Sequence, residues 1–302
     1  MKMKPAFIAT LLLLIVPAAF TVVEAVHYAN ANRSTNRIVS GGEEREYTLY
    51  VPASYDRSRP TPLVISIHGA GMWPASHQAT SQWNRVADQH GFIVVYPSGR
   101  TGHGPRTFGP YDLRYIADLI DEIQRTYNID RARIFANGLS NGGGMSFLLS
   151  CAMPERIAAV GLVGAAHLEP WSSCRDRRPV PMISFHGTAD PLTQYNGGWS
   201  WQVQQTFPGI PEWTANYARR NRCSLVPVES RVTADVTKIE YAECADNAPV
   251  ILYKVEGGGH TWPGGGYLPE WFAGKTADTI DASSLMWEFF SQHPLQNRRG
   301  EL

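Results

Sequence analysis

The strongest constraint on this chain is a glycine-flanked serine at residues 138–142, which read Gly-Leu-Ser-Asn-Gly. An apolar run precedes this turn, and small residues typical of a buried helix start follow it. In a G-x-S-x-G turn between a strand and a helix, the serine is lifted above the carboxyl edge of a sheet. Glycine suits the flanking positions because the turn needs unusual backbone angles and a close approach of helix and strands. We therefore predict a strand–turn–helix unit that presents Ser140 as a nucleophile.

An acid and a histidine follow Ser140, each placed at the end of a predicted strand. Residues 182–190 predict a buried strand and a loop with Asp190 at its tip, and residues 250–255 predict a strand that leads to His260. The chain order Ser, Asp, His is that of the α/β-hydrolase architecture. We predict Ser140 as nucleophile, His260 as general base and then acid, and Asp190 as the group that orients the imidazole.

Upstream of these residues, an apolar strand at 62–67 is followed directly by a His-Gly-Ala-Gly loop. In this architecture the loop after that strand and the residue after the nucleophile each donate a backbone N–H to the oxyanion. We predict that Ala70 and Asn141 supply these two amides. His68 is expected to brace the loop and to take no part in the chemistry.

Apolar strands alternate with amphipathic helices along the rest of the chain, which predicts a mostly parallel central sheet with helices on both faces, an α/β-hydrolase fold. The chain has 302 residues and 43% hydrophobic side chains, enough for a large core. One catalytic domain is expected at 44–292, beginning with an edge strand at 44–51 and ending before a tail at 293–302. Other predicted elements are strands at 92–96 and 158–164 and helices at 82–90, 112–127 and 279–292.

The N-terminus resembles an export signal. Two lysines precede an apolar run at residues 7–23, and a small-residue cleavage site follows. We predict a signal peptide at 1–25, cleaved after Ala25, a flexible segment at 26–43, and a secreted protein. The alternative is an uncleaved anchor, because the run approaches the length that spans a bilayer; Pro17 within the run favours cleavage.

Four cysteines form two couples that are local in sequence, Cys151 with Cys174 and Cys223 with Cys244. Three disulfide pairings are possible, and we favour these local ones. Neither couple has CxxC spacing, so we predict no zinc site, and no other metal or cofactor. The 27 basic and 27 acidic side chains balance, which argues against a nucleic-acid partner, and no membrane partner is expected after cleavage. The expected partner is a small or oligomeric ester.

Three stretches, residues 138–143, 186–191 and 257–265, resemble secreted poly(3-hydroxybutyrate) depolymerase-type and feruloyl-esterase-type α/β-hydrolases, and the likeness extends over 44–292. The resemblance implies hydrolysis of carboxylic esters by a serine triad, with Ser140, Asp190 and His260 on the catalytic positions. It also supports both disulfides. It does not choose the substrate, because the family includes feruloyl, acetyl-xylan and hydroxybutyrate activities.

Depolymerases that attack solid polyester usually add a linker and a substrate-binding domain, and no segment here resembles either. This departure favours soluble esters, with feruloyl or related carbohydrate esters first and hydroxybutyrate polymer or oligomers as the alternative. A second alternative is a carbohydrate-binding protein that keeps the fold without the chemistry. An intact Ser, His and Asp set argues against that reading.

The loops expected at the catalytic edge are rich in aromatic residues, which suit a planar phenolic acid or the face of a sugar. Of these residues, we predict that only Trp262, next to the base, lines the cleft. For the others, packing within the loops is the simpler expectation. They are Trp73, Trp199, Trp201, Trp213, Tyr267, Trp271 and Phe272, with Met72 beside them.

Overall fold

A ten-stranded sheet organises the part of the chain that the computed structural model describes, which is residues 36–100, 106–165, 174, 177–201, 204–266 and 268–296. The predicted signal peptide at 1–25, Tyr267 and the end of the predicted tail lie outside the described residues. Within the described ranges, no helix is both long and apolar enough to cross a membrane.

The middle of the sheet is parallel and its two flanks are antiparallel. The strands from β4 to β12 in the spatial order run parallel, as predicted for this fold. A separate hairpin joins β8 (Gly198–Ser200) and β9 (Gln205–Phe207). In spatial order the sheet strands are β1 (Asn36–Ser40), β2 (Glu43–Tyr50), β4 (Ile93–Pro97), β3 (Thr61–Ile67), β5 (Ile129–Leu139), β6 (Val160–Val163), β7 (Met182–Gly187), β12 (Val250–Val255), β11 (Val236–Tyr241) and β10 (Val228–Arg231).

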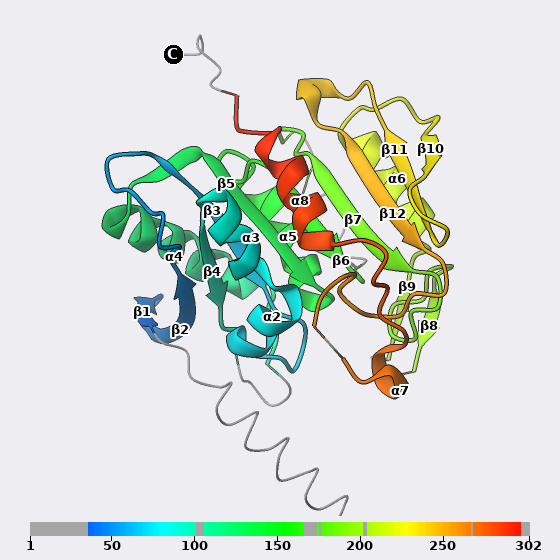
Figure 1. The fold of residues 1–302 in the computed structure, drawn as a ribbon, viewed down its shortest axis with the longest axis horizontal. Helices are drawn as coiled ribbons and strands as arrows, with labels where there is room; N and C mark the ends of the chain where they lie inside the picture. The colour runs from blue at the N-terminus through cyan, green and yellow to red at the C-terminus, as the bar shows by residue number, and fades with distance from the viewer. Residues whose placement is uncertain are drawn as a thin grey trace, which may run out of the picture.

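Helices cover both faces of the sheet (Figure 1). One hydrophobic core lies between the sheet and α4, α5 and α6, and a second lies between the other face and α3 and α8. This arrangement confirms the predicted α/β-hydrolase fold class. The helices are α2 (Pro74–Ser81), α3 (Trp83–His90), α4 (Leu113–Thr126), α5 (Asn141–Ala152), α6 (Ile210–Arg220), α7 (Glu270–Ala273) and α8 (Ala282–Ser291), with short 3-10 turns at Pro110–Asp112 and Ala245–Asn247.

The strand β3 shows how one segment serves both cores. Its side chains are all buried, with Leu63 and Ile65 in the core under α4 and α5 and Val64 in the core under α3 and α8. Successive side chains of a strand point to opposite faces, so a strand covered on both faces must be apolar throughout. The continuous apolar runs of the sequence therefore mark the centre of the sheet.

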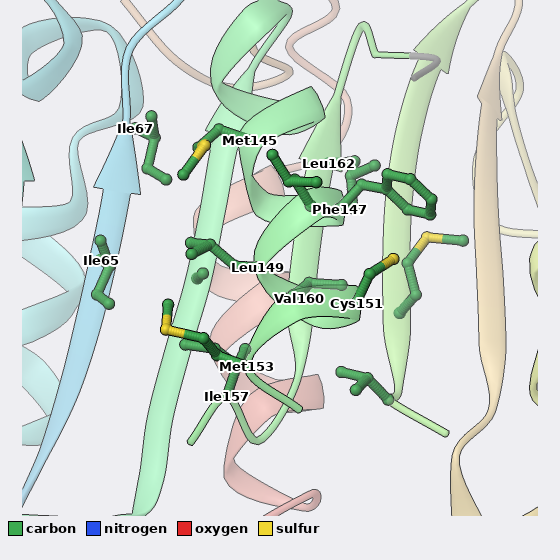
Figure 2. Close-up of a cluster of buried hydrophobic side chains, with 14 of the residues drawn as sticks. Ile65, Ile67, Met145, Phe147, Leu149, Cys151, Met153, Ile157, Val160 and Leu162 are labelled. Carbon is green, nitrogen blue, oxygen red and sulfur yellow. The ribbon is translucent and has the colours of Figure 1, made fainter. Parts of the chain in front are cut away.

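The helix α5 is buried almost all round, as expected for a helix that is apolar on every face. Figure 2 shows Met145, Phe147 and Leu149 pointing from α5 toward neighbouring strands, where Ile65 and Leu162 meet them. Because α5 begins directly after Ser140, this packing holds the turn in place against the sheet.

The predicted edge strand is not at the edge. Residues 36–40, expected to belong to a flexible segment, form β1 and pair with β2 in an antiparallel hairpin. The turn between them is Gly41-Gly42, with both φ angles positive, at 60° and 85°. Two consecutive positive φ angles are what a tight hairpin turn requires, and paired glycines supply them without strain. The Gly-Gly signal was present in the sequence, but the polar residues before it concealed the strand.

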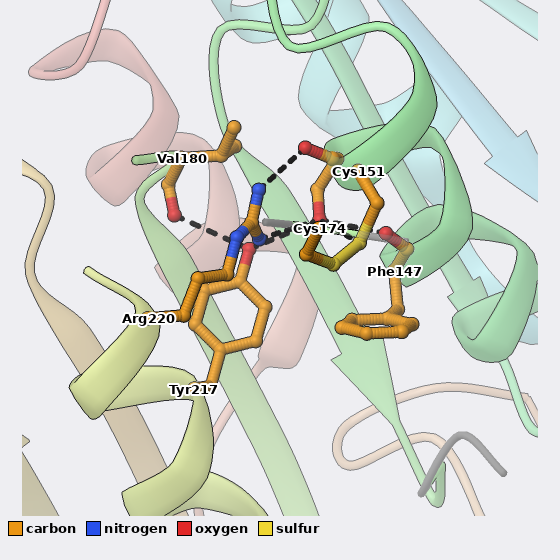
Figure 3. Close-up of a disulfide and its surroundings, with 7 residues drawn as sticks. Phe147, Cys151, Cys174, Val180, Tyr217 and Arg220 are labelled. Carbon is orange, nitrogen blue, oxygen red and sulfur yellow. Dashed lines mark hydrogen bonds between the residues drawn. A yellow bond between two sulfur atoms is a disulfide. The ribbon is translucent and has the colours of Figure 1, made fainter. Parts of the chain in front are cut away.

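Both favoured cysteine pairs are disulfide-bonded, Cys151 with Cys174 and Cys223 with Cys244. Figure 3 shows the first bond at the end of α5, beside side chains from α6. There the Arg220 guanidinium donates to the Ser150 hydroxyl and carbonyl at 2.9 and 2.6 Å, and the Tyr217 hydroxyl lies 3.2 Å from the Val180 carbonyl. The Arg220 hydrogen bonds tie α6 to the end of α5, and the disulfide ties the same end of α5 to Cys174.

Removing the first disulfide should destabilise the fold. The double variant Cys151→Ala/Cys174→Ala opens a loop whose ends are 23 residues apart, and a loop of that size is worth about 3 kcal/mol of unfolding free energy. Urea unfolding of the two proteins, followed by circular dichroism, measures the difference. A loss below about 1 kcal/mol would contradict the expectation, since it would mean that the surrounding hydrogen bonds constrain the chain without the covalent link.

Candidate active site

Ser140 stands at the sharp turn between β5 and α5, where the sequence predicted it. Its φ angle is positive, at 53°, a conformation that is rare for a residue with a side chain. Its amide donates to the Val163 carbonyl of β6 at 2.8 Å. A Cβ on Gly142 would lie 2.1 Å from the Ile67 carbonyl oxygen, so only glycine allows α5 to approach β3 this closely. The turn therefore holds Ser140 in a strained backbone state that the packing around it maintains.

Asp190 and His260 form a buried pair at the ends of β7 and β12. His260 Nδ1 lies 2.8 Å from Asp190 Oδ2, and the two residues are 5% and 4% exposed. The other carboxylate oxygen accepts the amides of Leu192 and Thr193, each at 2.8 Å. With Nδ1 directed at the carboxylate, Nε2 of the imidazole is left as the nitrogen able to accept a proton.

The surroundings of Asp190 favour its charged form. Burial alone would raise the pKa of the Asp190 carboxyl, but His260, His186 and the Thr193 amide outweigh burial and leave the pKa below its ordinary value. His186 Nε2 lies 3.4 Å from Asp190 Oδ2 and donates to the Thr193 carbonyl at 2.7 Å. Burial lowers the pKa of His186, so this imidazole stays neutral while it supports the loop that carries the acid.

A short peptide segment at the end of β6 connects the serine to the Asp–His pair. Val163 accepts the Ser140 amide, and the next residue, Gly164, lies against the His260 ring. The structure therefore brings Ser140, Asp190 and His260 to one edge of the sheet. Among the described residues, the Ser140 hydroxyl makes no hydrogen bond to His260. In free enzymes of this kind such contacts are often long and tighten only when substrate binds.

Gly164→Ala should impair the site through His260. At this position φ is +55°, and an added Cβ would lie 3.1 Å from His260 Nδ1 and 3.5 Å from Asp190 Oδ2. A displacement of the imidazole by a fraction of an ångström to one ångström is expected to lower kcat/KM by about 10- to 100-fold. Steady-state ester hydrolysis measures it. The matched control is Gly42→Ala, which has a positive φ and no atom within 4 Å of the added Cβ. An equal loss in both variants would show that backbone strain, and not the His260 contact, is responsible.

The loop after β3 lies beside the nucleophile, as the sequence predicted. A Cβ on Gly69 would lie 3.5 Å from the Cβ of Ser140, and the next residue, Ala70, is exposed. Asn141 is the first residue of α5, where backbone N–H groups have no partner inside the helix. Its side-chain amide bonds the Phe108 backbone twice, accepting its N–H at 2.7 Å and donating to its carbonyl at 3.0 Å. Ala70 and Asn141 stay our prediction for the oxyanion donors.

His68 braces this loop and is fully buried. Its Nδ1 donates to the Gly69 carbonyl at 2.8 Å, and its Nε2 accepts the Gly99 amide at 3.0 Å. The ring also packs on Phe108, with centroids 4.8 Å apart. Because Phe108 in turn holds Asn141, His68 connects both predicted oxyanion segments, in the bracing role expected from the sequence.

A buried polar network behind the turn was not predicted. Asn137 Oδ1 accepts the Ser66 hydroxyl at 2.9 Å and the Trp83 indole N–H at 3.0 Å, and His77 Nε2 lies 3.0 Å from Ser66 Oγ. Since Ser66 gives its one proton to Asn137, His77 is the donor in their bond and carries its proton on Nε2. No motif in the sequence joins these residues, which come from β3, α2, α3 and β5.

The buried His68 and His77 should make the fold sensitive to acid. Burial lowers the pKa of His68 to about 4 and that of His77 to about 3, against 6.5 when exposed. Below about pH 6.5 these histidines are protonated in the unfolded chain but stay neutral in the folded protein. The free energy of unfolding therefore falls as the pH drops toward 4, by on the order of 3 kcal/mol per histidine.

Urea unfolding between pH 7 and pH 4 measures this loss. In His77→Gln the pH dependence should be shallower than in the unmodified protein, whatever the substitution does at pH 7. The exposed His90 offers the matched control, because His90→Gln should leave the slope unchanged. Parallel slopes for His77→Gln and the unmodified protein would contradict the assignment.

Trp262 does not line a cleft, and this prediction was wrong. The side chain is 1% exposed, belongs to the core beneath α3 and α8, and donates its N–H to the Ser283 hydroxyl at 3.1 Å. Its ring also meets His77, with centroids 5.5 Å apart. Trp262, two residues after His260, therefore anchors this loop in the core. Trp213 is buried as well, whereas Trp199, Trp201, Trp271 and Phe272 are exposed.

Within the described part of the chain, no group of three or more His, Cys, Asp or Glu side chains is arranged to hold a metal ion. The arrangement places a buried imidazole, paired with a carboxylate, at the same sheet edge as a serine on a strained turn. A serine on a strained strand–helix turn, a buried Asp–His pair and a parallel sheet between helices define an α/β-hydrolase.

Comparison with known proteins shows that the chain is similar to esterases. The family model described as esterase PHB depolymerase matches residues 45–174. A bifunctional acetylxylan esterase/xylanase of Neocallimastix patriciarum is 26% identical over 83% of this chain and 34% of its own length. Feruloyl esterase B of Piromyces equi is 29% identical over 72% of this chain and 42% of its own length. This chain thus spans about a third to two fifths of these two relatives.

A solved structure supports the fold independently. The acetyl xylan esterase of Aspergillus awamori superimposes with a TM-score of 0.54 at 18% identity, over 75% of this chain and 93% of that one. The chain is therefore similar to α/β-hydrolases of the poly(3-hydroxybutyrate) depolymerase and feruloyl esterase type, as the motifs in the sequence indicated, and the relatives it matches are named as esterases.

Proposed function

We propose that this protein is a serine carboxylesterase that hydrolyses soluble esters, foremost feruloyl or related esters of carbohydrates. The observation that carries the proposal is the buried Asp190–His260 pair, with its 2.8 Å contact, at the same sheet edge as the strained Ser140 turn. The names of the relatives, acetylxylan esterase and feruloyl esterase, favour carbohydrate esters.

In the first half of the proposed reaction, Ser140 Oγ attacks the ester carbon while His260 Nε2 takes its proton. The negative charge that develops on the carbonyl oxygen is stabilised by the amides of Ala70 and Asn141, each worth about 3–4 kcal/mol in the transition state. Asp190 stabilises the imidazolium. The bond to the alcohol oxygen then breaks, the alcohol takes the proton from Nε2, and an acyl-serine remains.

Water completes the cycle by the same steps. His260 Nε2 removes a proton from the water as its oxygen attacks the acyl carbon, and the bond to Ser140 Oγ breaks. The proton returns from Nε2 to Oγ, and the acid leaves. The imidazole is then unprotonated again when the next substrate binds.

Parallel assays on methyl ferulate, p-nitrophenyl acetate and hydroxybutyrate oligomers test the substrate class. Turnover of methyl ferulate supports hydrolysis of feruloyl esters. The name of the family model favours a second candidate, hydrolysis of poly(3-hydroxybutyrate) or its oligomers, and turnover of the oligomers alone would establish it in place of the first. No turnover of any ester, together with no labelling of Ser140 by a fluorophosphonate, would overturn both and favour a non-catalytic carbohydrate-binding protein.

We further propose that the protein is exported. The two disulfides suit an oxidising compartment, and the predicted signal peptide at 1–25 gives a route to it. Intact-mass measurement of secreted material tests the cleavage, and a mass that includes residues 1–25 would show retention.

A further inference from the structure

Two pairs of aromatic side chains stand out on the surface of the described residues. Trp271 and Phe272 on α7 are 87% and 50% exposed, and Trp199 and Trp201 at the β8 hairpin are 44% and 80% exposed. Within each pair the ring centroids are 5.9 Å apart. Large aromatic side chains normally contribute to a core, so two exposed pairs call for a partner outside the chain.

The segment that carries Trp271 and Phe272 is hydrogen-bonded to the backbone at His260. The carbonyl of Ala273, next to Phe272, accepts the His260 amide at 2.5 Å, and the Lys275 carbonyl accepts the Gly259 amide at 2.8 Å. A Cβ on Gly259 would lie 2.2 Å from the Ala273 oxygen, so the two backbones are in direct contact. The helix α7 is therefore fixed beside the catalytic edge while its rings face solvent.

The hairpin that carries Trp199 and Trp201 is hydrogen-bonded to the loop that follows Asp190. The turn that begins at Asp190 leads to Gln194, whose side-chain amide reaches the Trp199 carbonyl at 3.5 Å. Figure 1 shows α7 and the β8–β9 hairpin at the end of the sheet toward which β5, β7 and β12 point. The segments that carry the two aromatic pairs are thus hydrogen-bonded to the segments that carry His260 and Asp190.

The exposure of the rings indicates what they bind. A pocket for a small phenolic acid must enclose most of the ligand, and rings exposed by 44–87% do not form such an enclosure. Open rings suit a long ligand that lies across them. A sugar ring presents a face of C–H groups to an aromatic ring and directs its hydroxyls to the side, where the exposed Gln194, Asn196 and Glu270 offer hydrogen-bond partners.

Resting on the proposed function, we propose that the Trp199/Trp201 and Trp271/Phe272 pairs bind the saccharide chain that carries the ester, by stacking on its sugar rings. They extend the substrate site beyond the ester group and make the enzyme prefer esterified oligosaccharides to small esters. A polyester surface is the competing partner. We favour a saccharide because polar and charged side chains adjoin the rings, whereas a polyester offers no hydroxyl groups to satisfy them.

The test uses two double variants of the full chain, Trp199→Ala/Trp201→Ala and Trp271→Ala/Phe272→Ala. The control is Val226→Ala/Val228→Ala, which removes side chains that are 81% and 64% exposed, just before and at the start of β10, the strand at the far edge of the sheet. We compare kcat/KM for a feruloylated or acetylated xylo-oligosaccharide with kcat/KM for p-nitrophenyl acetate. The ratio should fall about tenfold in each aromatic variant, mainly through KM, and should not change in the control.

A ratio that stays constant in both aromatic variants would overturn the proposal, as would loss of adsorption to a poly(3-hydroxybutyrate) film with no effect on the oligosaccharide ester. Unesterified xylohexaose, titrated into Ser140→Ala and followed by isothermal titration calorimetry, tests the inference without turnover. Weaker binding in the aromatic variants supports it, and equal binding contradicts it. If the unmodified protein hydrolyses no ester, the proposed function fails, and the xylohexaose titration still decides whether saccharide binds.

Discussion

Ser140→Ala is expected to lower kcat by about a factor of 10⁴ to 10⁶ on any ester that the unmodified protein hydrolyses. The substitution removes the atom that attacks the carbonyl, and no other group at the turn replaces it. The oxyanion amides and substrate binding remain, so a residual rate above that of water is expected. KM should change little, because the hydroxyl contributes mainly to the transition state.

Active-site titration and stopped-flow kinetics measure the loss, and thermal unfolding shows whether the fold is kept. A positive φ is as unfavourable for alanine as for serine, so the variant keeps the backbone strain of the turn. The matched control is Ser291→Ala, at the exposed end of α8. Labelling by a fluorophosphonate should disappear in Ser140→Ala alone. Labelling that persists there would mean that another serine is the nucleophile.

Asp190→Asn is expected to lower kcat by about 10⁴-fold while the protein stays folded. An asparagine side chain can direct its NH₂ group at His260 Nδ1, which then has to accept a hydrogen bond. The imidazole proton moves to Nε2, the nitrogen that has to take the serine proton, and the base is disabled. The substitution also removes the buried negative charge that stabilises the imidazolium, which in the unmodified protein lies 2.8 Å from His260 Nδ1.

The pH profile separates this role from a structural one. In Asp190→Asn the residual kcat should rise at high pH, where hydroxide can remove the serine proton in place of His260. Asp278→Asn, an exposed aspartate near α8, is the control and should keep both rate and profile. A loss below tenfold in Asp190→Asn would contradict the assignment and point to another group that orients His260.

Much of the fold could be predicted because the apolar runs and glycines in the sequence occur where the folded protein has buried strands and helix ends. The apolar runs that became β3, β5 and β7 are buried on both faces, so their composition alone identified them as central strands. The helix predicted at 112–127 is α4, and Gly91, with its positive φ, ends α3 as expected. The hairpin of β1 was missed because its pairing depends on a turn and not on an apolar run.

The predicted residues of the site could be placed only in part. The strand ends put Ser140, Asp190 and His260 at one edge, because parallel strands end on the same side of a sheet. The direction of Trp262 could not be predicted, since the loop after His260 is shaped by contacts with α3 and α8 far away in the chain. The buried network of Ser66, His77 and Asn137 was equally hidden, because these residues meet only after β3, β5 and α2 have packed together.

The amino-acid sequence alone was enough to predict the central strands, the turn that lifts Ser140, and the order of serine, acid and histidine. Glycine spacing and apolar runs act over a few residues, so they can be recognised without knowledge of the fold. The packed fold was needed to show which aromatic rings are buried, which face solvent, and that His77 joins the polar network behind the turn. Those outcomes depend on contacts between segments that are distant along the chain, and the free energy of such contacts exists only once the sheet has formed.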